Sequence, residues 1–185
     1  MPKIIENIKD KLLAEAKRQI TEQGYGKTTV RSVASACGVG VGTVYNYFES
    51  KDMLIASFVL SDWMECLEKM RTQISPDPRI TLASVYNGLC EFIHRNKALF
   101  EDADAIKSFN SSHLSRHALL RGQIASMIYP VCNKTADDRA FLSEFIAESL
   151  LSWTLEGRDF DQIYSDKNAL SSAVLLHTGY IIEAI

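Results

Sequence analysis

The sequence predicts an all-α protein of about nine helices. Apolar residues recur at steps of three and four through most of the 185 residues, whereas the alternation typical of strands is almost absent. Only four prolines interrupt the chain, and 46% apolar with 23% charged residues is an ordinary globular composition. These observations argue against long disorder or a fibrous repeat, and the length suffices for a small domain joined to a larger one.

The N-terminal part is expected to hold one long helix and two short ones. An apolar stripe marks the long helix, at Ile5, Ile8, Leu12, Ala16 and Ile20. The glycines at positions 24 and 26 end it. Thr28 and Thr29 then offer a side-chain oxygen to the free amides of a helix that ends near Cys37. The turn 38–40 leads into a further short helix over about 41–47.

Longer helices are expected to follow. Ser50 caps a helix that runs from Lys51 to about Ile74, with Asp52 in the first turn, where the helix dipole favours a negative charge. The remaining helices are expected near 80–95, 97–108, 113–132, 136–157 and 166–184, and Pro130 should kink or end its helix. We therefore divide the chain into an N-terminal domain, residues 1–50, and a C-terminal helical bundle, residues 51–185.

The last two of these helices carry apolar residues around more of their surface than a peripheral helix needs. Two consecutive helices cannot easily both be central, so a two-fold homodimer built from them is the economical explanation. The residues expected at this dimer interface are Phe145, Leu150, Leu151, Leu170, Val174, Tyr180 and Ile181.

Several other kinds of site and location are disfavoured. No run of about 18 uncharged apolar residues could cross a membrane, and the charged N-terminus lacks the apolar stretch of a signal peptide, so a cytoplasmic protein is expected. The four cysteines lie far apart with no C-x-x-C pair, which favours reduced thiols over a structural zinc site. We therefore expect no metal and no cofactor. His113 and His117 could share a metal on one helix face, but half-exposed surface positions are the favoured interpretation.

The charge is distributed unevenly along the chain. The first 51 residues hold eight Lys or Arg against five Asp or Glu, a balance of +3, although the whole chain carries −3. The second short helix presents hydroxyl, phenol and amide groups from Thr43, Tyr45, Asn46 and Tyr47, with no carboxylate, and Lys51 follows. Such donors hydrogen-bond phosphate oxygens. The pattern favours docking of this helix into a groove.

The segment from Thr28 to Lys51, TTVRSVASACGVGVGTVYNYFESK, closely resembles the DNA-binding domain of TetR-type transcriptional regulators. The resemblance rests on the Thr-Thr-Val-Arg start, the Ala-x-x-x-Gly-Val turn and the Gly-Thr-Val-Tyr-Asn-Tyr-Phe-x-Ser-Lys end, and it covers about residues 5–60. Beyond this region only the length and the all-helical layout agree. The resemblance implies a three-helix helix-turn-helix domain followed by a ligand-binding and dimerisation bundle.

The resemblance also implies roles for individual residues. Residues 42–47 would form the recognition helix in the major groove of a palindromic operator, after a supporting helix at about 30–37. Hydroxyl groups and Lys51 fall where such proteins hold the phosphate backbone, and Arg31, Val41 and Asn46 are candidate base readers. For Tyr45 the alternative is a position partly in the core, and for Arg31 it is contact with a phosphate. Phe48 is expected in the core. The candidate DNA contacts are Thr29, Arg31, Val41, Gly42, Thr43, Tyr45, Asn46, Tyr47 and Lys51.

The run Gly40-Val41-Gly42 departs from the common pattern of the family, in which a serine often caps the recognition helix. Glycine at the cap costs only a few tenths of a kcal/mol relative to serine. Gly42 inside so short a helix costs up to about 1 kcal/mol relative to alanine. We therefore expect a recognition helix that orders fully only on DNA, and specificity that comes largely from thymine-methyl contact and DNA shape.

In the resembling family, a small molecule bound in the C-terminal half changes the spacing of two DNA-binding domains, which must lie about 34–36 Å apart to enter successive major grooves. The resemblance thus implies a repressor that an effector releases from its operator. An aromatic-rich pocket would favour an apolar or aromatic effector. The candidate pocket residues, each with ordinary core packing as the alternative, are Trp63, Phe92, Phe100, Phe109, Met127 and Trp153.

Three other classes of protein fit the sequence less well. An enzyme is not expected, because no glycine-rich phosphate loop, nucleophile elbow or H-E-x-x-H motif is present. A helical interaction module that has lost DNA binding would keep the fold but not the face of hydrogen-bond donors. A sigma-like or recombinase protein is disfavoured, because the motif lies at the N-terminus of a larger acidic body.

Overall fold

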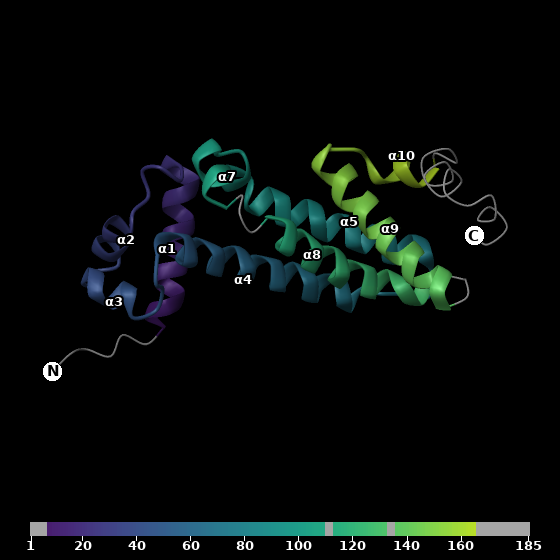
Figure 1. The fold of residues 1–185 in the computed structure, drawn as a ribbon, viewed down its shortest axis with the longest axis horizontal. Helices are drawn as coiled ribbons and strands as arrows, with labels where there is room; N and C mark the ends of the chain where they lie inside the picture. The colour runs from purple at the N-terminus through teal and green to yellow at the C-terminus, as the bar shows by residue number, and fades with distance from the viewer. Residues whose placement is uncertain (1–6, 110–112, 133–135, 166–185) are drawn as a thin grey trace. The chain divides into compact units, whose positions relative to one another are not determined.

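The computed structural model describes residues 7–109, 113–132 and 136–165, and all the regular structure in these ranges is helical (Figure 1). The all-α prediction is therefore confirmed for this part of the chain. The helix expected over 166–184 lies outside the described residues. The helices are α1 (Ile8–Gln23), α2 (Val30–Ala36), α3 (Val41–Tyr45), α4 (Lys51–Thr72), α5 (Pro78–Arg95), α6 (Lys97–Phe100), α7 (Ala103–Phe109), α8 (His113–Ile128), α9 (Ala136–Leu155) and α10 (Phe160–Ser165).

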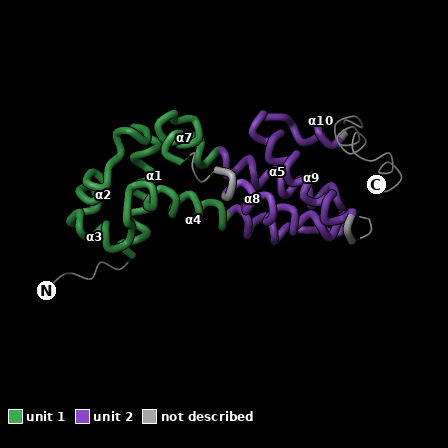
Figure 2. The backbone as a smooth tube through the Cα atoms, viewed as in Figure 1, with its two compact units in different colours: residues 1–65, 94–113 green, residues 66–93, 114–185 purple. Residues whose placement is uncertain are grey.

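The chain forms two compact units, which do not follow the division at residue 50 (Figure 2). Unit 1 consists of residues 1–65 and 94–113, so it contains α1, α2, α3, most of α4, and the helices α6 and α7. Unit 2 consists of residues 66–93 and 114–185. Helices α4 and α5 each contribute to both units. The segment 94–113 therefore packs with the N-terminal region, although it is remote from it in sequence.

One apolar core holds unit 1 together. Its fully buried members include Leu12 of α1, Val33 of α2, Val44 of α3 and Ile55 of α4, and Leu99 of α6 lies in the same cluster. The burial of Ile8, Leu12, Ala16 and Ile20 confirms the apolar stripe expected for the first helix. We refer to α1, α2 and α3 as the head.

An ion pair and a helix end reinforce this core. Lys17 of α1 reaches the largely buried carboxylate of Asp62 in α4 at 2.6 Å. Gly24, with φ of +82°, ends α1 in a conformation that other residues rarely adopt, and its amide donates to the Ile20 carbonyl. The head is thus tied to α4 by charge as well as by apolar packing.

The prediction of a single helix over 97–108 is wrong, because the structure has two helices there. Helix α6 ends at Phe100, and Asp102 begins α7: its Oδ1 accepts the backbone N–H groups of Asp104 and Ala105 at 3.0 and 3.1 Å. An aspartate that accepts the first free amides of a helix competes with continuation of the preceding one. This break places the Asp102 carboxylate at the surface of the head, as described below.

Unit 2 packs α5, α8, α9, α10 and the end of α4 within itself. A Cβ at position 88 would collide with the side chain of Met70, so this close approach of α5 to α4 requires glycine. Tyr86 donates a hydrogen bond to the Arg158 carbonyl, and Arg79 pairs with Asp161 of α10 at 2.6 Å. These contacts hold α10 against α5.

The end of α8 agrees with the sequence prediction, whereas helix α10 was not predicted. Helix α8 stops at Ile128, and Pro130 lies in the 3₁₀ turn that follows, as expected of proline. Helix α10 was not expected: Asp159, whose Oδ1 accepts the amides of Asp161 and Gln162 at 3.0 and 3.2 Å, starts a helix there. In the described ranges, no helix has the length and apolar composition needed to span a membrane.

Candidate nucleic-acid interface

Helix α2 begins with a fully satisfied cap. Thr29 has extended backbone angles, its Oγ1 accepts the Ser32 amide at 3.0 Å, and its own amide donates to Ser32 Oγ at 3.0 Å. This reciprocal arrangement is a capping box with serine in the role usually taken by Glu or Gln. Thr28 is buried, and its hydroxyl donates to the Gly24 carbonyl. The predicted capping role of this pair is confirmed for Thr29.

Helix α3 has no such cap. Its N-cap is Gly40, which supplies no side-chain hydrogen bond, and open space surrounds the position where Gly42 would carry a Cβ. Packing holds the helix instead. Val44 is fully buried, Val41 packs partly against the core, and Phe48 just beyond the helix is 4% exposed. Phe48 is therefore a core residue, as expected.

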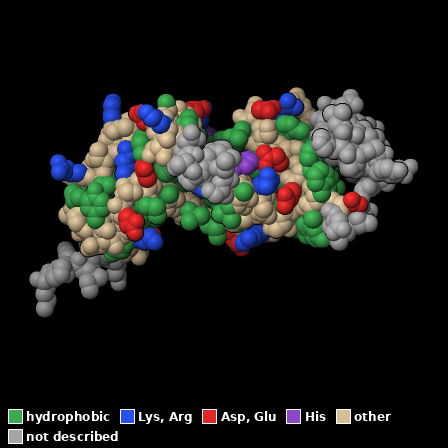
Figure 3. All heavy atoms as spheres, in the orientation of Figure 1, with side chains coloured by type: hydrophobic (Ala, Val, Ile, Leu, Met, Phe, Trp, Pro, Cys, Tyr) green, Lys and Arg blue, Asp and Glu red, His purple; other side chains and the backbone are tan. Residues whose placement is uncertain are grey.

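The opposite face of α3 is open to solvent. Tyr45 and Tyr47 are 52% and 46% exposed, and Gly42 and Asn46 are exposed as well. Tyr45 is therefore not a core residue. In the space-filling view, the end of unit 1 that carries α2 and α3 shows apolar side chains with both basic and acidic ones around them (Figure 3). Phenol, amide and backbone groups thus face outward from a segment whose other side is fixed in the core.

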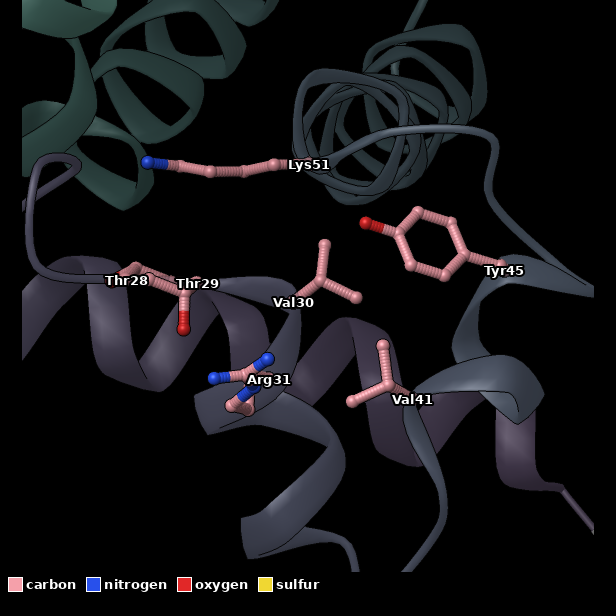
Figure 4. A pocket seen from close by; sticks show the side chains of 7 residues that line it. All are labelled: Thr28, Thr29, Val30, Arg31, Val41, Tyr45 and Lys51. Atoms are coloured by element: carbon pink, nitrogen blue, oxygen red, sulfur yellow. The ribbon is translucent and has the colours of Figure 1, made fainter.

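A depression of about 400 Å³ lies beside this face (Figure 4). Val30 and Val41 project into it, and the Tyr45 hydroxyl points toward it from α3. Lys51 runs along its edge. The lining residues are Thr28, Thr29, Val30, Arg31, Val41, Tyr45 and Lys51. The structure therefore brings five of the nine candidate DNA contacts around one concave surface.

The remaining four candidates, Gly42, Thr43, Asn46 and Tyr47, lie on or directly after α3. Arg31 is exposed in the first turn of α2, and no hydrogen bond or ion pair joins it to the other residues that the structure describes. A guanidinium in this position is available to an external anion or to a base edge.

Lys51 differs from the other candidates because its ammonium is already engaged. Its Nζ donates to the Tyr25 carbonyl at 2.5 Å and lies 3.5 Å from the centroid of the Tyr25 ring. Burial lowers the pKa of Lys51, while the carboxylates of Asp52, Asp102 and Asp104 act in the opposite direction. The charge that was expected on the phosphate backbone is thus directed toward the turn after α1.

Tyr25 is the residue that the sequence interpretation missed. Its amide donates to Asp102 Oδ2 at 2.9 Å, and its hydroxyl donates to Asp52 Oδ1 at 2.5 Å and lies within hydrogen-bond distance of Ser108 Oγ, at 3.0 Å. Burial and the bond to Asp52 raise the pKa of its phenol. A tyrosine between two glycines, three residues before the Thr-Thr pair, was the only sequence signal.

The six candidate pocket residues do not gather in one compact unit. Trp63, Phe100 and Phe109 belong to unit 1, where the Phe109 ring meets the Tyr25 ring edge-on at 6.2 Å. The other three, Phe92, Met127 and Trp153, belong to unit 2. The predicted effector pocket stays a prediction.

The candidate dimer residues are only partly described. Leu150 and Leu151 are buried within the single chain, whereas Phe145 is half-buried. The outer face of α9 instead exposes Phe141 and Leu155. Leu170, Val174, Tyr180 and Ile181 lie outside the described residues.

The histidine pair is likewise described in part. The side chain of His113 lies outside the described residues, and His117 lies 3.7 Å from Glu148. Among the side chains that are described, no group of three or more His, Cys, Asp or Glu could hold a metal ion.

Comparison with known proteins identifies the N-terminal region. Residues 12–58 match the sequence model of the family described as "Bacterial regulatory proteins, tetR family". The N-terminal part of the chain is thus similar to the TetR family. The matched range contains α2, α3 and all nine candidate DNA contacts, and it ends in the first part of α4.

Relatives are similar to this chain over part of its length. The transcriptional regulator UidR of Escherichia coli K12 is 28% identical over 64 residues, which is 35% of this chain and 33% of UidR. The alignment therefore spans about a third of that relative's length.

Solved structures resemble the chain over almost its whole length. PfmR from Thermus thermophilus, a TetR-family transcriptional regulator, has a TM-score of 0.56 at 18% identity and covers 93% of this chain and 96% of its own. FadR from Bacillus subtilis, solved in complex with stearoyl-CoA, has a TM-score of 0.51 at 20% identity and covers 92% and 98%. At these identities the likeness shows a shared fold.

Proposed function

We propose that this protein is a TetR-type, sequence-specific DNA-binding transcriptional regulator, and that it acts as a repressor which a small-molecule effector releases from a palindromic operator. The main support is the two-sided construction of α3. Val44 and Phe48 fix one side in the core, while Tyr45, Asn46 and Tyr47 present donors to solvent on the other. A short helix that is rigid on one side and rich in donors on the other is suited to a DNA groove.

Arg31 extends this face beyond α3. It lies in the first turn of α2, and the depression between the two helices has Arg31, Tyr45 and Thr29 on its rim. We assign the hydroxyl groups and Lys51 to phosphate contacts and Arg31, Val41 and Asn46 to the bases. Because Val41 is apolar, contact with a thymine methyl is its expected mode of base recognition.

Filter binding to duplex DNA across a salt series tests the proposal. Phosphate contacts release condensed counterions, so the affinity should fall steeply as salt is raised. Lys51→Ala should weaken binding to all sequences alike and reduce the salt slope by about one. Binding that is absent, or that is insensitive to salt, would instead favour a helical interaction module that has lost DNA binding.

Selection of bound sequences from random duplexes tests specificity and symmetry together. A palindrome with half-sites about 34–36 Å apart is expected if two heads enter successive major grooves. An asymmetric site, or no enriched site, would contradict a two-fold dimer on an operator.

We further propose that the dimer uses the C-terminal helices. The apolar groups Phe141 and Leu155 on the outer face of α9 support this proposal. Light scattering should show monomers for Phe141→Glu combined with Leu155→Glu, with the helical circular dichroism retained. Leu150→Glu serves as a control, because burial of Leu150 predicts loss of folded protein rather than a folded monomer.

The effector is proposed to be apolar or aromatic, as the residues Trp63, Phe92 and Trp153 suggest. Thermal denaturation with a panel of such compounds tests this, since a ligand that binds only the folded state raises the unfolding temperature. Stearoyl-CoA, the ligand in the FadR structure, is one member of the panel. A compound that raises the unfolding temperature without weakening DNA binding would contradict its role as a releasing effector.

A further inference from the structure

The turn between α1 and α2 joins three separate parts of unit 1. Tyr25, at the centre of this turn, contacts Lys51 and Asp52 at the start of α4 and Asp102 and Ser108 of the segment 94–113. Ser108 also donates to Asp52 Oδ2 at 2.7 Å, so the hydroxyls of Tyr25 and Ser108 both bond to the Asp52 carboxylate. One aromatic residue thus connects the phosphate-binding lysine of the proposed interface to helix α7.

The acidic residues Asp102 and Asp104 lie directly against this turn. A Cβ on Gly24 would lie 3.2 Å from Asp102 Oδ2, and a Cβ on Gly26 would lie 3.4 Å from Asp104 Oδ2. The carbonyl that holds the Lys51 ammonium belongs to the residue between these two glycines. Lys51 is therefore enclosed by a carbonyl, an aromatic ring and nearby carboxylates, which together we call the lysine cage (Tyr25, Asp52, Asp102 and Asp104).

The cage offers Lys51 the same kinds of interaction that a DNA phosphate would offer. An oxygen acceptor at 2.5 Å and a ring face at 3.5 Å satisfy the ammonium, and the surrounding carboxylates favour its charged form. An ammonium engaged in this way cannot simultaneously give its full charge to the DNA backbone. The two positions therefore compete.

We propose that Lys51 has two alternative partners, the Tyr25 carbonyl in the free protein and a phosphate of DNA in the complex, and that Asp102 and Asp104 favour the first. The acidic start of α7 is thus an intramolecular competitor of DNA, and Tyr25 is the positioning residue through which it acts. This inference rests on the proposed DNA-binding function and adds a means of regulating it.

The free state can be tested without DNA. A ring 3.5 Å from Nζ should shift the side-chain methylene resonances of Lys51 upfield in the NMR spectrum of the full chain. The resonances are assigned by their absence in Lys51→Arg. Tyr25→Leu removes the ring but keeps the backbone carbonyl, so the upfield shift should disappear in that variant. Methylene resonances at ordinary positions in the unsubstituted protein would overturn the proposal.

Titration with a selected duplex tests the exchange of partners. On binding, the upfield-shifted resonances of Lys51 should move to ordinary positions, because the ammonium leaves the ring. If the duplex binds and the shift persists, this inference fails while the proposed function stands. If no duplex binds in filter assays, the proposed function fails and the inference fails with it.

A double-mutant cycle tests the role of the acidic segment. Asp104 is exposed, and Asp104→Asn should raise DNA affinity by about two- to five-fold, the range expected for one exposed charge interaction. The gain should largely vanish in a Lys51→Ala background. Glu49→Gln is the matched control: it removes the same charge from an exposed position outside the cage, and any gain that it causes should persist with Lys51→Ala. Equal gains for Asp104→Asn in both backgrounds would overturn the competitor role.

Discussion

Helices α2 and α3 lie next to each other in the head, but different interactions hold them in place. The seven residues of α2 begin with a reciprocal pair of hydrogen bonds between Thr29 and Ser32, so local sequence fixes where the helix starts. The five residues of α3 follow the N-cap Gly40 and include Gly42, and neither glycine contributes a side-chain contact. Helix α3 depends on the burial of Val44 and Phe48 instead.

This difference bears on DNA recognition. The buried side of α3 fixes the position of the helix, whereas its first turn has no side-chain cap. That first turn can therefore adjust to a surface that it contacts. The proposed base readers Val41 and Asn46 lie at the two ends of this short segment. Helix α2, with its satisfied cap, gives Arg31 a fixed starting point. Four substitutions test this difference between α2 and α3.

The largest effect is expected at the anchor of α3. Phe48→Ala should lower the free energy of unfolding by about 3–5 kcal/mol, because it removes a buried aromatic ring and leaves a cavity. Urea denaturation measures the loss. Tyr47→Ala is the control, since this neighbouring ring is about half exposed and its removal should change stability by no more than about 0.5 kcal/mol while weakening DNA binding. Similar destabilisation by the two substitutions would show that packing does not hold α3.

A smaller effect is expected at the cap of α2. Thr29→Ala should cost about 1 kcal/mol of unfolding free energy, because it leaves the Ser32 amide without its acceptor. Thr29→Ser keeps the acceptor oxygen and should restore most of the loss. If alanine and serine at position 29 gave equal stability in denaturation, the cap would not be what fixes α2.

The interior of α3 should respond in the opposite direction. Gly42→Ala is expected to raise the free energy of unfolding by up to about 1 kcal/mol, since alanine favours the helix and open space surrounds the new methyl group. Slower hydrogen exchange at the α3 amides should accompany the gain. Gly38→Ala is a control with the opposite sign, because the φ of +69° at Gly38 strains any other residue. A Gly42→Ala protein without added protection would show that α3 is already fully ordered in the free state.

The smallest effect is expected at the N-cap of α3. Gly40 has φ of −72° and ψ of 150°, angles that serine adopts readily at a cap. Gly40→Ser should therefore stabilise the protein by a few tenths of a kcal/mol, which a precise comparison of denaturation midpoints can detect. A loss of stability would contradict the open space that surrounds position 40 in the structure.

Local patterns predicted much of the head correctly. Apolar spacing and cap residues placed α2 and α3 within about two residues of their observed ends, and they assigned Phe48 to the core. Ser50 caps α4 as expected, with its Oγ accepting the Met53 amide at 3.1 Å. These features depend on residues within a turn or two of one another, which is the range that helical periodicity and capping describe.

Other features depended on contacts between distant residues and could not be predicted. The Asp102 carboxylate breaks the chain into α6 and α7 by local capping, but it also accepts the amide of Tyr25, 77 positions away in the sequence. The direction of Lys51 follows from that arrangement. The family resemblance predicts one partner for Lys51, a DNA phosphate. The fold places a second partner, the Tyr25 carbonyl, within hydrogen-bond distance.

Residue order along the chain was enough to predict the helices of the described residues, the helix-turn-helix segment and the face of hydrogen-bond donors, because periodicity, capping and side-chain chemistry act over a few residues. The packing of residues 94–109 with the N-terminal region, and the contact of the Lys51 ammonium with Tyr25, became visible only in the folded chain. The physical reason is that a long flexible side chain goes to the nearest acceptor in space, and the chain's folding sets which acceptor that is.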